Sequence, residues 1–165
     1  MGSKRIEVAR IAPVLGTFYP PPFDAPCRMR ERRKLGDAAG LTQFGVNLLR
    51  LPPGAWSSQR HWHSREEEFV YVLAGEVILV TEGLEERLGP GDAAGFPAGE
   101  ANGHCLQNRS TAEALVLEIG TCNEAEDETR YPDIDLKAPA GGQPAMYTHR
   151  DGSAYQGLRR RGPGG

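Results

Sequence analysis

Two histidines and a run of glutamates near the middle of the chain have residue types and spacing that suit a metal site. His61 and His63 are separated by one residue, and three consecutive glutamates, residues 66–68, follow a Ser-Arg turn. In a β-strand, side chains two residues apart point to the same face, so the two imidazoles converge. A carboxylate at the start of the next strand, from Glu67 or Glu68, can face the same interior.

A second element with the same kind of chemistry lies downstream. In the segment GDAAGFPAGEANGHCLQN, residues 91–108, Pro-Gly turns lead to His104, and Asn108 follows four residues later. Three neutral imidazoles and one carboxylate suit Mn, Fe, Co, Ni, Cu or Zn, because Mg and Ca prefer shells made entirely of oxygen. The sequence therefore predicts one divalent transition metal per subunit.

Short strands are the elements that would position these residues. From residue 41 onward, apolar or alternating runs are separated by Gly and Pro, and no 15-residue stretch keeps a helical period. We expect strands at 41–51, 57–63, 67–73, 76–81, 84–88, 92–96, 103–108 and 113–119. This pattern indicates an all-β sandwich or barrel.

The length of 165 residues is enough for one well-buried core, flanked by tails. Residues 1–40 hold a Pro20–Pro22 run and a basic cluster at 28–34, and they predict an N-terminal arm without regular structure before Leu41. Residues 41–120 form the predicted β-barrel domain. Residues 121–165 are acidic and then rich in Pro and Gly, which predicts an irregular return segment and a flexible, arginine-rich tail.

Composition excludes several classes of partner. The net charge of −3 provides no basic surface for nucleic acid or an anionic membrane, and no apolar run approaches the roughly 20 residues of a membrane span. Three cysteines without CxxC spacing, and no apolar secretory signal, favour reduced thiols in the cytoplasm. We therefore expect a soluble protein whose partner is a small molecule.

The two elements together resemble the motifs of the cupin superfamily, Gly-x5-His-x-His-x3,4-Glu-x6-Gly and Gly-x5-Pro-x-Gly-x2-His-x3-Asn. His61, His63, Glu68 and Gly75 match the first, with six residues between Glu68 and Gly75, although Gly54 lies one residue further from His61 than the motif requires. In the second, Gly91, Pro97 and Gly99 match, Asn102 occupies the histidine position, and His104-x3-Asn108 restores the ending.

This resemblance implies a double-stranded β-helix of the jelly-roll type over about residues 41–120. It selects Glu68 over Glu67 and implies a ligand set of His61, His63, Glu68 and His104, with His104 displaced by a two-residue insertion. If Asn102 holds the structural position instead, His104 lies outside the ligand set. Asn108 is expected to be structural.

The strand after the glutamates is apolar on both faces. Phe69, Tyr71 and Leu73 lie opposite Glu68, Val70 and Val72. We expect the outer face to be covered by the N-terminal arm or by a second subunit, since cupins of this type are commonly homodimers.

A metal held by four protein ligands leaves positions open for substrate oxygens, which is more typical of catalysis than of a structural site. We therefore expect a metal-dependent enzyme of the isomerase, lyase or dioxygenase type that acts on a small, oxygen-rich metabolite. The alternative is a non-catalytic module that binds or senses a sugar or organic acid, because the sequence identifies no general base.

Overall fold

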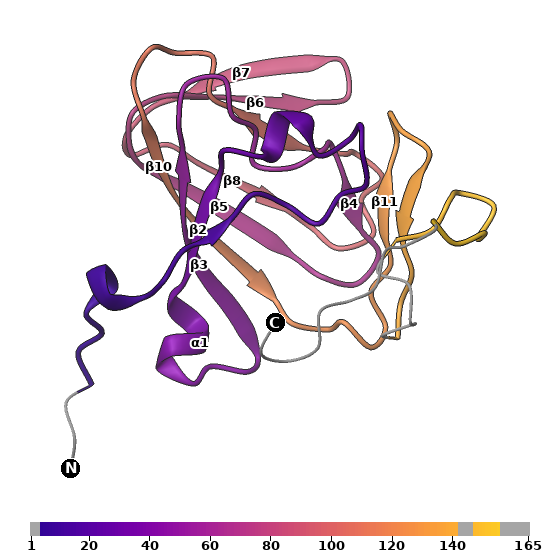
Figure 1. Cartoon of the computed structure of the whole chain (residues 1–165), viewed down its shortest axis with the longest axis horizontal. Helices are drawn as coiled ribbons and strands as arrows, with labels where there is room; N and C mark the ends of the chain where they lie inside the picture. Colours follow the sequence, from indigo (N-terminus) through magenta and orange to yellow (C-terminus); the bar gives the residue numbers. More distant parts are fainter. Residues whose placement is uncertain (1–3, 142–146, 156–165) are drawn as a thin grey trace.

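The computed structural model describes residues 4–141 and 147–155, and its largest unit is a six-stranded antiparallel sheet (Figure 1). The strand order of this sheet is β1-β2-β3-β10-β5-β8. Its strands are β1 (Val14–Leu15), β2 (Glu31–Lys34), β3 (Phe44–Leu51), β10 (Ala114–Thr121), β5 (Glu68–Ala74) and β8 (Ala93–Phe96). The predicted all-β fold is confirmed.

Two three-stranded sheets complete the architecture. The first has the order β7-β6-β9 and contains β6 (Val77–Thr81), β7 (Leu84–Leu88) and β9 (Cys105–Gln107). The second has the order β12-β11-β4 and contains β4 (Trp62–His63), β11 (Thr129–Tyr131) and β12 (Leu136–Ala138). Figure 1 shows β6 and β7 at one end of the molecule and β11 beside β4 at its edge.

Helical structure is limited to short pieces. The only α-helix in the described part of the chain is α1 (Leu35–Ala39), and the 3₁₀ turns are η1 (Val8–Arg10) and η2 (Ala25–Cys27). None of these helices is long and apolar enough to cross a membrane.

Side chains along β5 alternate between the inside and the outside of the sheet, and the inward ones form the main core with those of neighbouring strands. Val70 and Val72 point inward. The core residues that pack with them come from the six-stranded sheet, from the β7-β6-β9 sheet and from the loop after β3: Leu49, Leu51, Ala55, Val77, Leu79, Leu106, Ala114 and Val116. Gly75 ends β5 with a φ of +73°, and a Cβ atom there would lie 2.3 Å from the Glu113 carbonyl oxygen. The turn therefore requires glycine at this position.

A second cluster joins the two ends of the chain. Tyr19 and Cys27 from the N-terminal region pack against Tyr131 and Leu136 from the C-terminal segment. All three cysteines are free, and Cys105 is buried as expected of a core thiol. The two terminal segments thus cover the end of the barrel at which β4 lies.

The prediction that residues 1–40 lack regular structure is wrong. β2 pairs with β3, with Arg32 opposite Leu49, and α1 follows directly. The cationic side chains of the basic cluster are only partly solvated, because Arg32 pairs with Glu118 and Arg30 is buried. Because Pro26 is the last proline of this region, the backbone of β2 is free to form a ladder.

The predicted strands within 41–120 agree with the structure to within a few residues, with one exception. The stretch 57–63 forms regular ladder only at Trp62–His63, and single bridges join Trp56 to Gln107 and His61 to His104. Beyond residue 121, β11 and β12 form a hairpin where the sequence predicted only irregular chain. The predicted flexible tail lies mainly outside the described residues.

Candidate metal centre

Three different parts of the fold bring the predicted ligands together. His61 and His104 face each other across an isolated bridge, in which each backbone N–H donates to the other carbonyl at 3.1 and 2.8 Å. His63 lies on β4, and Glu68 begins β5. The bridge aligns the imidazoles of His61 and His104, whose ring centroids are 4.8 Å apart.

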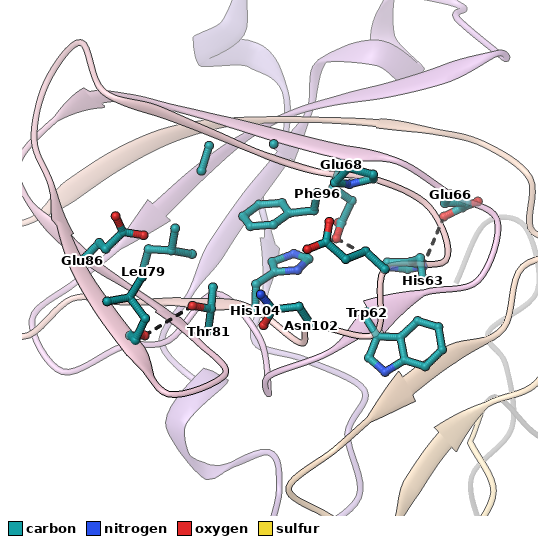
Figure 2. Close-up of a pocket in the computed structure, with 15 residues that line it drawn as sticks. Trp62, His63, Glu66, Glu68, Leu79, Thr81, Glu86, Phe96, Asn102 and His104 are labelled. Atoms are coloured by element: carbon teal, nitrogen blue, oxygen red, sulfur yellow. Dashed lines mark hydrogen bonds and ion pairs between the residues drawn. The ribbon is translucent and has the colours of Figure 1, made fainter.

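The four side chains converge on one carboxylate oxygen. Glu68 Oε2 lies 3.3 Å from His61 Nε2, 3.5 Å from His63 Nε2 and 2.9 Å from His104 Nε2. Figure 2 shows Glu68, His63 and His104 close together, with the Phe96 ring beside His104. The centroids of the Phe96 and His104 rings are 3.5 Å apart and the rings stack, so packing fixes the position of the third imidazole.

Glu68 Oε2 is buried and has no hydrogen bond of acceptable geometry within the described structure. An unpaired buried carboxylate oxygen is costly, and a cation at the centre of the three Nε2 atoms would satisfy it. Imidazole nitrogens with one carboxylate oxygen are the ligands of Mn, Fe, Co, Ni and Zn. The residues therefore fit a divalent transition metal.

Hydrogen bonds at the opposite ring nitrogens orient two of the imidazoles. His61 Nδ1 lies 3.0 Å from the Gln59 carbonyl oxygen, and His63 Nδ1 lies 2.6 Å from Asp127 Oδ2. Because these oxygens accept hydrogen bonds, the proton belongs on Nδ1 of each ring. The Nε2 lone pairs are thereby directed toward Glu68, as a metal ligand requires.

Asp127 binds the backbone of the turn after His63 as well as the His63 ring. Its Oδ1 atom accepts hydrogen bonds from the backbone N–H groups of Arg65 at 2.8 Å and Glu66 at 3.1 Å. Although burial opposes it, these bonds and the His63 contact lower the pKa of Asp127 to about 2. Asp127 is therefore a carboxylate that fixes both a predicted ligand and the turn that leads to Glu68.

Burial and neighbouring charges also set the pKa values of the predicted ligands Glu68 and His104. Burial would raise the pKa of Glu68, but the adjacent imidazoles of His61, His104 and His63 lower it well below its usual value. For His104, burial is the largest influence and lowers the pKa, despite Glu68. These directions favour an ionised Glu68 and a neutral His104, the forms that bind a metal.

The structure separates His104 from the alternative residue Asn102. The Asn102 side-chain oxygen accepts a hydrogen bond from the Glu82 backbone N–H at 2.9 Å, whereas His104 Nε2 approaches Glu68. Asn108 donates to the carbonyl oxygens of Leu51 and Ala112 at 2.7 and 2.8 Å, so it ties loops together as expected of a structural residue.

Two cavities each border at least three of the predicted ligands, and they share His63, Glu66, Glu68 and His104. The first, of about 270 Å³, we call the acidic cavity (Figure 2). Besides the shared residues it is lined by Trp62, Leu79, Thr81, Leu84, Glu86, Ala94, Gly95, Phe96, Pro97, Glu100 and Asn102.

The second, of about 330 Å³, we call the arginine cavity. It includes His61, and therefore all four predicted ligands, together with Arg30, Arg32 and Glu118. Three tyrosines also line this cavity: Tyr19, Tyr131 and Tyr147.

Sequence reasoning missed several of these residues. Glu66 was not among the predicted site residues, but its side chain is largely buried and lines both cavities. Asp127 lay in an acidic run with no motif around it, and it reaches His63 across 64 positions of sequence. Only an observed pairing of β4 with β11 could have revealed it.

The all-β fold and the His-Glu cluster that could hold a metal ion are the features by which the class of this protein is recognised. The family model for the cupin domain matches residues 47–120. The chain belongs to the cupin superfamily. A comparison with curated proteins gave no match.

Solved structures extend the likeness beyond the cupin domain. A sugar phosphate isomerase of the cupin superfamily from Silicibacter pomeroyi is 41% identical, with 93% of this chain and 97% of that chain covered and a TM-score of 0.84. A candidate sugar phosphate isomerase from Acidithiobacillus ferrooxidans is 33% identical, with coverages of 80% and 82% and a TM-score of 0.68. A polyketide cyclase from Streptomyces resistomycificus, 24% identical over 73% of this chain and 80% of its own with a TM-score of 0.58, shares the fold.

Proposed function

We propose that this protein is a metal-dependent sugar phosphate isomerase, with His61, His63, Glu68 and His104 as the ligands of one divalent transition metal. The observation that carries the proposal is the convergence of three Nε2 atoms on the unpaired Glu68 Oε2 within a cavity. The Silicibacter pomeroyi protein, which is similar over nearly the whole chain, supplies the substrate class.

Interconversion of an aldose and a ketose fits this site because it needs no redox cofactor. A base removes the proton from the carbon next to the carbonyl group and returns it to the carbonyl carbon. The proton of the neighbouring hydroxyl group moves to the former carbonyl oxygen, so atoms and electrons balance within one substrate. A bound divalent metal would polarise the carbonyl and hydroxyl oxygens and stabilise the charge that develops there. The surrounding barrel keeps those oxygens out of bulk water.

The structure offers carboxylates for the proton transfer that the sequence did not identify. Glu66 lines both cavities, and Glu118 lines the arginine cavity, where Arg32 fixes it with hydrogen bonds of 2.7 and 3.0 Å. Separate Glu66→Gln and Glu118→Gln variants distinguish their roles. The variant that retains metal and loses kcat without a matching rise in KM identifies the base.

The experiment that tests the function is direct. Metal-loaded protein is incubated in deuterium oxide with a panel of aldose and ketose phosphates, and the products are followed by proton and phosphorus NMR. We expect interconversion and deuterium at the carbon that exchanges its proton, both lost after chelation and in His61→Ala. Substrate that binds but is recovered unchanged and unlabelled would leave the alternative, a sugar-binding or sensor module.

We also infer that the protein is a homodimer joined through the outer face of β5. Phe69, Tyr71 and Leu73 are 42, 38 and 47% exposed, so the N-terminal arm does not cover them. On the adjacent strand β10, Leu117 pairs with Tyr71 and Ile119 pairs with Phe69, and both extend the same apolar surface. An apolar face of this kind favours association in water.

A further inference from the structure

Arg30 is a buried cation without a counter-charge. Arg30 lies immediately before β2 in the sequence, and the residue is only 8% exposed. Nε donates to the Gly16 carbonyl oxygen at 2.9 Å, and Nη1 donates to the Ser57 carbonyl oxygen. Both acceptors are neutral, and no carboxylate in the described part of the chain lies within ion-pair distance. A buried guanidinium in this state favours an anion supplied from outside.

Arg32 brings a second guanidinium to the same cavity. It pairs with Glu118 through Nε and Nη2. No hydrogen bond is found, over residues 4–141 and 147–155, for Nη2 of Arg30 or for Nη1 of Arg32. Neither nitrogen is a fully buried atom that lacks a hydrogen-bond partner, so each has some surface open to the cavity or to solvent. Each arginine thus keeps a charged donor for a ligand.

Tyrosines connect the arginines to the predicted metal ligands. Tyr131 stacks over His61 at 5.9 Å, and its ring packs against Tyr19 at 5.6 Å and Tyr147 at 6.3 Å. Burial raises the pKa of Tyr19 and of Tyr147, even though Arg30 acts in the opposite direction. Both hydroxyl groups are therefore neutral at physiological pH and can donate hydrogen bonds to an oxyanion.

The acidic cavity cannot serve an anion equally well. Its wall carries Glu66, Glu68, Glu86 and Glu100, and no lysine or arginine is among the residues that line it. The arginine cavity also carries four glutamates, Glu66, Glu68, Glu118 and Glu124, but Arg30 and Arg32 line it as well, and Glu118 is paired with Arg32. A dianion would be repelled in the acidic cavity, whereas planar guanidinium groups form strong paired hydrogen bonds with phosphate oxygens.

We propose that Arg30 and Arg32, with the hydroxyls of Tyr19 and Tyr147, bind the phosphate group of the substrate. The sugar carbons then extend past Tyr131 toward His61 and Glu68, where the carbonyl group reacts. This inference rests on the proposed function for its substrate, but its residues lie outside the predicted ligand set. Because β2 and Tyr147 lie outside the matched cupin segment, the phosphate specificity would come from the ends of the chain.

Orthophosphate binding, measured by isothermal titration calorimetry on metal-loaded and metal-free protein, tests the subsite without catalysis. We expect binding in both forms, and a loss of affinity of about tenfold to hundredfold in Arg30→Gln and in Arg32→Gln. Arg109→Gln is the matched control, because Arg109 pairs with Glu85 outside both cavities. Phosphate binding that requires the metal and ignores both arginines would overturn the proposal.

Substitution of the buried Arg30 risks misfolding, so circular dichroism and two milder variants accompany it. Arg30→Lys keeps the charge and loses the fork, and Tyr147→Phe removes only a hydroxyl group. We expect both to fold and to bind orthophosphate more weakly than the original protein. Unchanged affinity in both folded variants would contradict the role of this wall.

A comparison of substrates separates this inference from the proposed function. The subsite predicts a much higher kcat/KM for a phosphorylated sugar than for the same sugar without phosphate, with the difference reduced in Arg32→Gln. Equal kcat/KM for the two sugars would leave the isomerase standing and remove the subsite. A sugar phosphate that displaces orthophosphate but is never isomerised would support the subsite and remove the isomerase. Failure of sugar phosphates to displace arginine-dependent orthophosphate would show a site for the free ion and contradict the proposal.

Discussion

The acidic cavity and the arginine cavity share four residues and differ in nearly everything else. The first is bordered by the β6–β7 and β8 side of the barrel and carries only negative charges on its wall. The second is bordered by β2, β3 and β10 and by the tyrosines of the two terminal segments, and it carries both arginines besides its glutamates. The difference teaches where the proposed substrate would place its two ends, because only the wall with arginines offers cations to an anionic group.

Loss of a metal ligand should have the largest effect, since both cavities depend on the shared cluster. We expect His61→Ala and His104→Ala to weaken metal binding by more than about a hundredfold, because outer-shell substitutions alone cost about 10- to 100-fold. Asn102→Ala should retain the metal. Elemental analysis of protein purified without a histidine tag, with competition titrations, measures this. Metal retained by His104→Ala and lost from Asn102→Ala would reverse the assignment.

Asp127→Asn should weaken metal binding by about 10- to 100-fold, because the carboxylate that orients His63 is lost. Asp135→Asn is the control, since Asp135 pairs with His149 and lines neither cavity. The chemical shifts of the His63 ring nitrogens should change in Asp127→Asn only. A weaker metal affinity without that change would indicate a general loss of stability instead of a positioning role.

Neutralisation of the acidic wall should have a much smaller effect on substrate affinity than loss of either arginine. We expect Glu86→Gln and Glu100→Gln to change KM for a sugar phosphate by less than about fivefold, because exposed charges contribute at most about 1 kcal/mol. Steady-state kinetics on both variants and on Arg32→Gln measures the contrast. A larger rise in KM from the acidic wall than from Arg32 would exchange the roles of the two cavities.

Leu73→Glu should leave both cavities intact and change only the assembly, because Leu73 lines neither of them. Because the Leu73 side chain projects from the outer face of β5, a charge there should convert a dimer into a monomer without altering kcat. Sedimentation velocity at micromolar concentration reads the result. A single 17.9 kDa species in the unmodified protein would exclude the dimer.

The sequence by itself determined the features that depend on local periodicity. Alternation of side chains along short runs located nearly all strands of the 41–120 region, and the same two-residue period placed His61 and His63 on one face. The resemblance to the two cupin motifs then selected Glu68 and added His104 to the predicted cluster. Each of these features is encoded within about 20 residues, so no knowledge of distant contacts was required.

Only the tertiary structure decided which distant residues support the cluster. Asp127 reaches His63 across 64 positions, and Arg32 reaches Glu118 across 86. In sequence, Arg30, Arg32 and Asp127 stand in charged runs that are indistinguishable from solvated tails. They enter the barrel because β2 pairs with β3 and β11 pairs with β4. The partner of a strand edge depends on the packing of the whole chain, and a local pattern does not specify it.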